Sequence, residues 1–345
     1  MPRNQTDKKR TPNHRSIETL NRKSAPALGL DDLIQGFERL GLSAGDNVVV
    51  HSSLSSFGKV DGGADTVIDA LEAVITDAGT LVMPTFSGQV VYVLEALALR
   101  SGLHGTGGSG TGPIYSGTLT DLWIAIRELS DEAGIATPFT SEEVLQDRLW
   151  GESKNLKRWG ITLNKTDAMG SSWVGIRRAG PPIPENDVAP GKMPVWTGMI
   201  PETFWRRSET IRSTQYSGSF AAWGRFAEPL LLGHNNRPGQ THEEHPLNRL
   251  KMAGGRVLLL GVDHTSNSTI HVAQWFAVRN AGIQLPDGTE EFMENFQDVD
   301  EPMDTNSGQR RTQIGFADIR LADTTCLYEV VADLLAKKLV KEGAS

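Results

Sequence analysis

The chain has 345 residues, of which 22% are charged and 38% are hydrophobic, a composition typical of a folded globular protein and not of a disordered one. Its net charge of −8 argues against a nucleic-acid-binding surface. The single cysteine, Cys326, excludes an intramolecular disulfide and a cysteine-rich metal site. We expect no bound metal.

Targeting signals are not evident. No apolar run reaches the roughly 18–20 residues that a membrane span requires. Residues 1–15 are polar and basic and lack the hydrophobic centre of a secretory signal. We predict a cytoplasmic protein without a membrane partner. It should have a disordered leader over residues 1–25 and one α/β domain over residues 26–345, interrupted by an insertion at about 87–189.

The first predicted elements form a β-α-β unit. A helical pattern over residues 30–40 precedes the apolar run Val48–Val50, which is typical of a buried parallel strand. A second helical stripe extends from Val67 to Ile75, and Thr80–Met83 reads as a second buried strand that ends at a proline. The two strands should be parallel, with a right-handed crossover between them.

The turn inside this unit is the most informative segment. Residues 51–63 are rich in serine and glycine and lead into the helix. Unpaired backbone amides and hydroxyls at the start of a helix favour a phosphate or another polar ligand. An ordinary strand–loop–helix connection would show the same pattern, and this block alone supports both interpretations equally.

The predicted insertion differs in character. It contains the glycine- and serine-rich tract Gly105–Gly112, which we interpret as a loop and not as a dinucleotide fingerprint, because no strand leads into it. Helices are predicted around residues 122–129 and 141–150, and the proline-rich segment 181–194 returns the chain to the main body. We expect a lid against the core and not a separately folding domain.

The last third is again of α/β type. We predict a helix over residues 220–232, a buried strand over 256–262, a helix over 269–278 and a closing amphipathic helix over 326–340.

Three blocks, read in order, resemble the aminoglycoside 3-N-acetyltransferase family. No single block is decisive, but their order is specific. The resemblance covers about 30–86 and 193–280 well and the C-terminal helix loosely, and it does not extend to the insertion. The first block is Val50-His51-Ser52-Ser53-Leu54-Ser55-Ser56-Phe57-Gly58 together with Gly79-Thr80-Leu81-Val82-Met83-Pro84-Thr85-Phe86. The second block is Gly198-Met199-Ile200-Pro201-Glu202 together with Arg212-Ser213 and Ser219–Gly224. The third block is Pro246–Leu250 together with Gly255–Val262 and Asn267–His271.

The resemblance implies a three-layer α/β/α fold with a mixed, largely parallel central sheet and a long inserted segment. It also implies acetyl-coenzyme A as the acetyl donor and an amine of an aminoglycoside-like small molecule as the acceptor. Backbone amides at a helix start suit a pyrophosphate, and ligands of open α/β sheets bind at the carboxyl ends of strands. The residues implied to bind coenzyme A are Ser52, Ser53, Leu54, Ser55, Ser56, Phe57, Gly58, Val60, Gly62, Gly63, Thr85 and Phe86.

The resemblance further implies direct attack of the amine on the thioester, with a histidine as general base. The family pattern Arg-Ser-x-His-Pro is here Arg212-Ser213-Thr214-Gln215-Tyr216, so Gln215 occupies the histidine position. The helix after the last predicted strand usually reads Leu-His-x-x-Glu, and here Gln274 replaces the glutamate. Glutamine cannot accept a proton near neutral pH.

Three explanations of these departures remain open. Another residue could be the base, with His245 as the obvious substitute and His242 beside it. The amine could arrive neutral or lose its proton to water, so that positioning supplies much of the rate. Finally, the protein could have changed its acyl donor, become a hydrolase, or kept only the binding of coenzyme A or another small ligand.

The remaining candidates have alternative structural roles. The pair His242 and His245 could bind a metal, although a solvated acidic loop explains them better. His51 is better explained as a structural histidine than as a catalytic one, and His271 fits packing and substrate contact equally. No Gly-x-Ser-x-Gly elbow indicates a serine hydrolase. The insertion could also serve as the arm of a homodimer. The predicted catalytic residues are His245, Gln215 and His271, and the predicted substrate-binding residues are Glu202, Tyr216, Asn267 and Gln274.

Overall fold

The computed structural model describes most of the chain after the predicted leader. The first described residue is residue 25, so residues 1–24 of the predicted leader lie outside the described residues. The tract Gly105–Gly112 also lies outside them, except for Gly112. The described residues are 25–100, 112–132, 139–158, 160–168, 171–179, 186, 188–189, 191–215, 218–235, 241–282, 293 and 295–341.

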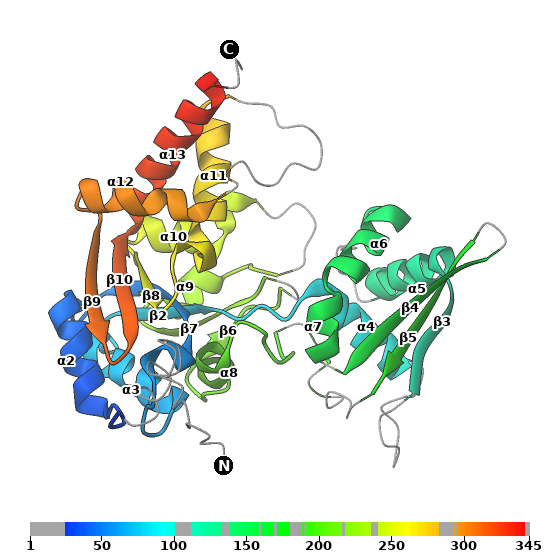
Figure 1. Cartoon of the computed structure of the whole chain (residues 1–345), viewed down its shortest axis with the longest axis horizontal. Helices are drawn as coiled ribbons and strands as arrows, with labels where there is room; N and C mark the ends of the chain where they lie inside the picture. Colours follow the sequence, from blue (N-terminus) through cyan, green and yellow to red (C-terminus); the bar gives the residue numbers. More distant parts are fainter. Residues whose placement is uncertain are drawn as a thin grey trace, which may run out of the picture.

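A mixed sheet of seven described strands forms the centre of the main body (Figure 1), in the order β6-β7-β2-β1-β8-β10-β9. The mixed α/β sheet was predicted, but parallel pairing is confined to the three central strands β2, β1 and β8. The outer pairs are antiparallel. The strands are β1 (Asn47–Ser52), β2 (Thr80–Pro84), β6 (Ile211–Arg212), β7 (Phe220–Gly224), β8 (Arg256–Leu260), β9 (Gln309–Ile314) and β10 (Ala317–Asp323).

Helices cover both faces of this sheet and give it three layers. In β1, Val48 and Val50 pack on one face while Val49 packs on the other, as the alternation of a strand requires. One face is covered by α2 (Leu30–Leu40), α3 (Ala64–Ile75) and α8 (Met199–Trp205). The other is covered by α9 (Ala227–Leu231), α10 (Pro246–Met252), α11 (Thr269–Asn280), α12 (Asp300–Thr305) and α13 (Thr324–Lys341).

One predicted helix is largely wrong. The segment 220–232 begins as strand β7, which pairs antiparallel with β2, and only Ala227–Leu231 is helical. Pairing with β2 overrides a local sequence that also suits a helix. The strand ends at Gly224, whose φ of +97° and close approach to the carbonyl of Gly79 leave no room for a side chain.

The insertion builds a sheet and a hydrophobic cluster of its own. Its antiparallel strands lie in the order β3-β5-β4, and the packed residues include Ile126, Phe139, Val174 and Ile176. Figure 1 shows this part beside the main sheet, with α4 as the first helix after the coil that leaves β2. The predicted helices at 122–129 and 141–150 are confirmed. The elements are α4 (Gln89–Arg100), β3 (Gly112–Thr118), α5 (Leu119–Glu132), α6 (Glu142–Gly151), α7 (Ser153–Arg158), β4 (Ile161–Ala168) and β5 (Ser171–Arg178).

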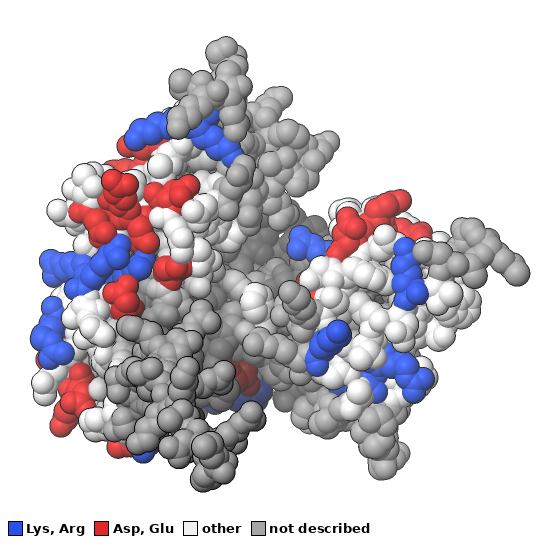
Figure 2. Space-filling model, viewed as in Figure 1, with Lys and Arg blue, Asp and Glu red and all other residues white. Residues whose placement is uncertain are grey.

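Charges of both signs are interspersed on the face of the molecule shown in Figure 2. Figure 2 shows acidic and basic side chains side by side on the main body and on the insertion, so the net charge is not collected in one field on this face. Among the described helices, none combines the length and the apolarity that a bilayer crossing requires.

Candidate functional site

Two cavities that share a lining residue lie where the three parallel strands end. The strand-end pocket, of about 320 Å³, and the serine groove, of about 670 Å³, share one lining residue, Ser52 at the end of β1. The pocket is lined by His51, Ser52, Pro84, Phe86, Trp196, Thr197, Pro201, Val262, Thr265, Ser266, Asn267, Ser268 and His271. The groove is lined by Ser52, Ser53, Leu54, Ser55, Gly58, Lys59, Val60, Gly63, Gly198 and Met199.

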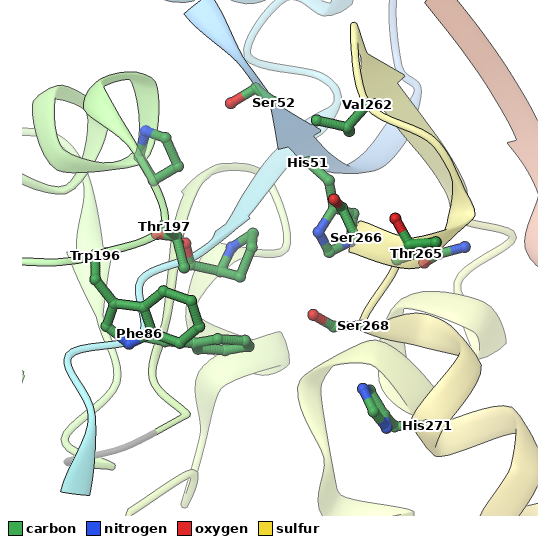
Figure 3. A pocket seen from close by; sticks show the side chains of 13 residues that line it. His51, Ser52, Phe86, Trp196, Thr197, Val262, Thr265, Ser266, Ser268 and His271 are labelled. Carbon is green, nitrogen blue, oxygen red and sulfur yellow. The ribbon is translucent and has the colours of Figure 1, made fainter. Parts of the chain in front are cut away.

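Topology explains this location. Parallel strands present their carboxyl ends at one edge of the sheet, where the connecting loops separate and leave a crevice. Ser52 ends β1, Phe86 follows β2 and Val262 follows β8, so segments far apart in sequence converge at this edge. Figure 3 shows Phe86, Trp196 and Thr197 facing Thr265, Ser266, Ser268 and His271 across the pocket, with His51 at its end.

The first wall is aromatic. The rings of Phe86 and Trp196 lie 6.2 Å apart, and Phe220 supports Phe86 edge-on at 5.5 Å. The backbone N–H of Trp196 donates to the carbonyl of Phe86 at 2.9 Å, and the hydroxyl of Thr197 donates to the carbonyl of Pro84 at 2.8 Å. These bonds fix the wall to the end of β2.

The opposite wall is polar and is anchored by a fully buried histidine. His264 bonds through Nε2 to the side-chain oxygen of Gln309 and through Nδ1 to the side chain of Asn267, both at 3.1 Å. The side-chain oxygen of Asn267 in turn accepts the backbone N–H of Thr269 at 3.0 Å. The start of α11 is thereby held in place, and α11 carries His271.

His271 is the exposed histidine of the pocket. It lies in the first turns of α11, and its ring packs edge-on against Phe296 at 4.8 Å. By contrast, His51 is 4% exposed, and burial together with the neighbouring His264 and His271 lowers its pKa to about 3. The pocket therefore contains one histidine open to solvent and one that stays neutral at pH 7.

The serine groove is formed by a tightly folded turn. Ser53 donates its backbone N–H to the carbonyl of Leu260 at 2.9 Å, which ties the turn to β8. Gly58 and Gly63 adopt φ values of +89° and +63°, which glycine accepts without strain. Gly261 lies so close to the side chain of Ser56 that any larger residue would displace it. Lys59 adds an exposed positive charge to the groove.

The residues predicted to bind coenzyme A fall into three groups. Ser52, Ser53, Leu54, Ser55, Gly58, Val60 and Gly63 line the serine groove, and Phe86 lines the strand-end pocket. Three more support the turn or the core and line neither cavity. Ser56 donates to the carbonyl of Ser53 at 2.6 Å, Phe57 is buried in the core, and Thr85 is buried against the hydroxyl of Ser219 at 3.1 Å. Gly62 lines neither cavity.

The predicted catalytic residues separate in space. Of Gln215, His245 and His271, the pocket lining includes His271 alone. The side-chain oxygen of Gln215 accepts the backbone N–H of Gly218. The Nδ1 of His245 accepts the N–H of Leu247 at 3.2 Å at the start of α10. Burial and nearby histidines lower the pKa of His245 to about 3.

The predicted substrate-binding residues mostly hold the walls in position. Glu202 accepts the N–H groups of Val195 at 2.8 Å and Trp205 at 2.9 Å, beside the segment that carries Trp196. Gln274 is buried and accepts the N–H of Met293 at 2.7 Å. Asn267 lines the pocket while stabilising the turn before α11. Tyr216 lies outside the described residues.

Sequence reasoning missed several lining residues. Lys59, Gly198 and Met199 belong to the serine groove, and the hydroxyl side chains Thr197, Thr265, Ser266 and Ser268 belong to the pocket. The signal for the last three was their place directly after a predicted buried strand, because loops at the carboxyl ends of parallel strands form the ligand crevice.

Comparison with known proteins agrees with this architecture. The model of the aminoglycoside 3-N-acetyltransferase family matches residues 49–94 and 162–336. An SPbeta prophage-derived aminoglycoside N(3')-acetyltransferase-like protein of Bacillus subtilis, YokD, is 27% identical over 307 residues, which are 85% of this chain and 87% of that protein. Aminoglycoside N(3)-acetyltransferase VII of Streptomyces paromomycinus is 27% identical over 247 residues, 71% of this chain and 59% of that protein.

Solved structures share the fold. The structure of AAC-IIIb in binary complex with CoASH superposes with a TM-score of 0.53 at 19% identity and covers 91% of this chain and 98% of that one. Because the family model spans more than half of the sequence, the chain belongs to the aminoglycoside 3-N-acetyltransferase family. The predicted family and its class, the N-acetyltransferases, are thereby confirmed.

Proposed function

We propose that the protein transfers an acetyl group from acetyl-coenzyme A to an amine of an aminoglycoside-like acceptor. The observation that carries this proposal is the meeting of two cavities of different character at Ser52. The groove suits the donor and the pocket suits the acceptor, so the junction is the place where the acetyl group would change partners.

The serine groove has the chemistry that coenzyme A requires. Serine hydroxyls, glycine backbone and the positive charge of Lys59 line an open trough that leads to the start of α3. A helix start attracts phosphate, and a lysine adds a charge-assisted hydrogen bond. The similar fold of AAC-IIIb, a protein whose structure contains CoASH, supports the same use of the groove here.

The strand-end pocket suits an amino sugar. Phe86 and Trp196 offer aromatic surface on which the apolar face of a sugar ring can pack, while hydroxyls on both walls can bond to its polar groups. The related proteins named as aminoglycoside N(3)-acetyltransferases support an acceptor of this class.

In the proposed reaction the amine nitrogen attacks the thioester carbonyl carbon directly. The tetrahedral intermediate collapses and coenzyme A leaves as the thiolate. His271 takes the proton from the nitrogen, because it is the predicted catalytic residue whose ring lines the pocket. His245 is less suited as a base, because its Nδ1 already accepts a backbone hydrogen bond and its neutral form then carries the proton on Nε2.

Two measurements test the proposal. Calorimetric titration with coenzyme A should show saturable binding, and no heat up to millimolar ligand would contradict the donor assignment. Thiol release from acetyl-coenzyme A should then depend on an added aminoglycoside. Binding without thiol release over a panel of aminoglycosides would favour the alternative, a relative with a different acyl transfer, a hydrolytic activity or ligand binding alone.

Two variants locate the base. His245→Ala should leave thiol release largely intact, because its ring lies outside the pocket lining. If this variant instead abolishes turnover while the protein stays folded, His245 and not His271 is the base. A large gain of activity in Gln215→His would show that the missing family histidine limits the native protein.

A further inference from the structure

His51 is one of the buried polar side chains that have an unpartnered atom, and it lies in the wall of the strand-end pocket. It is 4% exposed, it lines the strand-end pocket, and the next residue in the chain, Ser52, is the one common to both cavities. Its Nε2 is sealed from solvent and has no hydrogen-bond partner in the described part of the chain. The hydroxyl of Ser52 is likewise sealed and unpartnered.

The other buried histidines of this region are held differently. His264 uses both ring nitrogens, on Gln309 and Asn267, and His234 bonds through Nδ1 to the hydroxyl of Ser213 at 2.9 Å. A histidine kept only for structure is expected to be bonded in this way, because a buried polar atom without a partner costs about 1–3 kcal/mol. His51 carries this cost at the junction of the two cavities.

The sealed nitrogen determines the tautomer. A neutral imidazole has one N–H donor and one acceptor nitrogen. In proteins, a buried N–H group that lacks an acceptor is rarer than a buried acceptor atom that lacks a donor. The proton of neutral His51 is therefore expected on Nδ1, which is not among the sealed, unpartnered atoms of the described residues. Figure 3 shows this ring at the end of β1, beside Ser266 and between the two walls of the pocket.

We propose that His51 is an oxyanion-binding residue, which donates a hydrogen bond from Nδ1 to the carbonyl oxygen of the acyl thioester. This assignment rests on the proposed acetyl transfer and adds the group that stabilises its transition state. When the amine attacks the carbonyl carbon, the π electron pair of the carbonyl moves to the oxygen, and the N–H of His51 stabilises that charge. When the intermediate collapses, the pair returns, the C–S bond breaks, and the proton stays on His51.

The surroundings of His51 suit this role. The titratable groups beside it are His264 and His271, and neither supplies a negative charge that would favour an imidazolium. Burial and these two rings lower its pKa to about 3, so the ring remains a neutral donor throughout the physiological range. A neutral imidazole can polarise a carbonyl without surrendering its proton.

The most direct test uses the unaltered protein. Acetyl-coenzyme A labelled with ¹³C at the carbonyl is bound without acceptor, and the carbonyl stretch is measured by difference infrared spectroscopy. We expect the stretch to fall below that of free acetyl-coenzyme A. A bound thioester with an unshifted stretch overturns the role of His51 and leaves the proposed function standing. Failure of acetyl-coenzyme A to bind overturns both.

Two variants assign the shift to His51. His51→Leu removes the donor, and we expect kcat to fall about 10²- to 10³-fold with the affinity for coenzyme A nearly unchanged. His51→Asn places an amide N–H near the position of Nδ1, and it should restore much of kcat and of the infrared shift. A His51→Leu protein that binds coenzyme A normally and keeps kcat within about threefold contradicts the proposal. Equal loss in both variants also contradicts it.

Discussion

At the scale of single residues, the position where the family pattern has its histidine does not coincide with the pocket. Gln215 bonds to the backbone of Gly218 and is not among the lining residues, whereas His51 and His271 come from β1 and α11 and meet in the pocket. Gln215 therefore replaces the histidine of the family pattern, but the imidazole rings of His51 and His271 still line the pocket at the strand ends.

The role of His271 is tested by His271→Gln, which keeps a polar side chain but cannot accept a proton. We expect kcat to fall about 10²- to 10⁴-fold, the usual contribution of a general base, while coenzyme A binding is unchanged. His242→Gln is the matched control, because His242 is exposed and stacks on Trp275 at 4.2 Å, away from the pocket lining. Equal activity of the two variants would rule out His271 as the base.

Lys59 supplies a second prediction at this scale. Lys59→Gln should weaken coenzyme A binding about 3- to 10-fold at low salt, because a lysine–phosphate contact is lost, and the difference should shrink as added salt screens the charge. Lys337→Gln removes another exposed lysine, from α13, and should leave the titration unchanged. If both variants bind coenzyme A equally well and salt does not change the affinity, the phosphates of coenzyme A do not contact Lys59.

At the scale of elements, the turn after β1 depends on Gly261. Both Gly261 and Gly254 have positive φ, of +65° and +68°, but a side chain at Gly261 would collide with Ser56, whereas space is open around Gly254. Each substitution by alanine should cost roughly 1–2 kcal/mol through backbone strain. Gly261→Ala should lose about 1–3 kcal/mol more through overpacking and should also weaken coenzyme A binding.

Denaturant unfolding and calorimetry check this prediction. Gly254→Ala should bind coenzyme A like the unaltered protein. If Gly261→Ala is no less stable than Gly254→Ala and binds equally well, the contact between β8 and the serine turn does not shape the groove.

Elements with strong local patterns could be predicted from the sequence. The unit from α2 to β2 was recognised because buried faces and glycine ends agree over its whole length. Strand β7 was mistaken for a helix, since only its pairing with β2 defines it. The hairpin of β9 and β10 was missed, because exposed charges such as Arg310 and Arg311 obscure its apolar residues.

The candidate site was predicted from the sequence only in part. The turn 52–63 was found, because serine and glycine clustering at the end of a strand has a direct physical meaning. Of the far wall, Asn267 and His271 were predicted, but Thr265, Ser266 and Ser268 were not, because they become adjacent to His51 only once β8 lies beside β1. Roles that depend on the pairing of distant strands could not be read from local sequence.

At the scale of the whole molecule, buried histidines couple stability to pH. Burial lowers the pKa of His51 to about 3 and that of His234 to about 4, whereas in the unfolded chain both titrate near 6.5. Below pH 6.5 the unfolded state binds more protons, so stability is full above that pH and decreases as the pH falls toward 4. At pH 5 the loss should be on the order of 2 kcal/mol per histidine.

Urea unfolding at pH 7 and pH 5 measures this loss. His234→Gln should remove about 2 kcal/mol of the difference between the two pH values. A wild-type stability that is equal at the two pH values would contradict the buried neutral state of these rings.

We propose that the whole molecule joins a donor groove to an acceptor pocket for acetyl transfer. The most direct measurement incubates the protein with acetyl-coenzyme A and a panel of aminoglycosides, following thiol release and the mass of the acceptor together. We predict release of one thiol for each acetyl group gained by the acceptor. Coenzyme A binding with no acetylated acceptor from any member of the panel would contradict it.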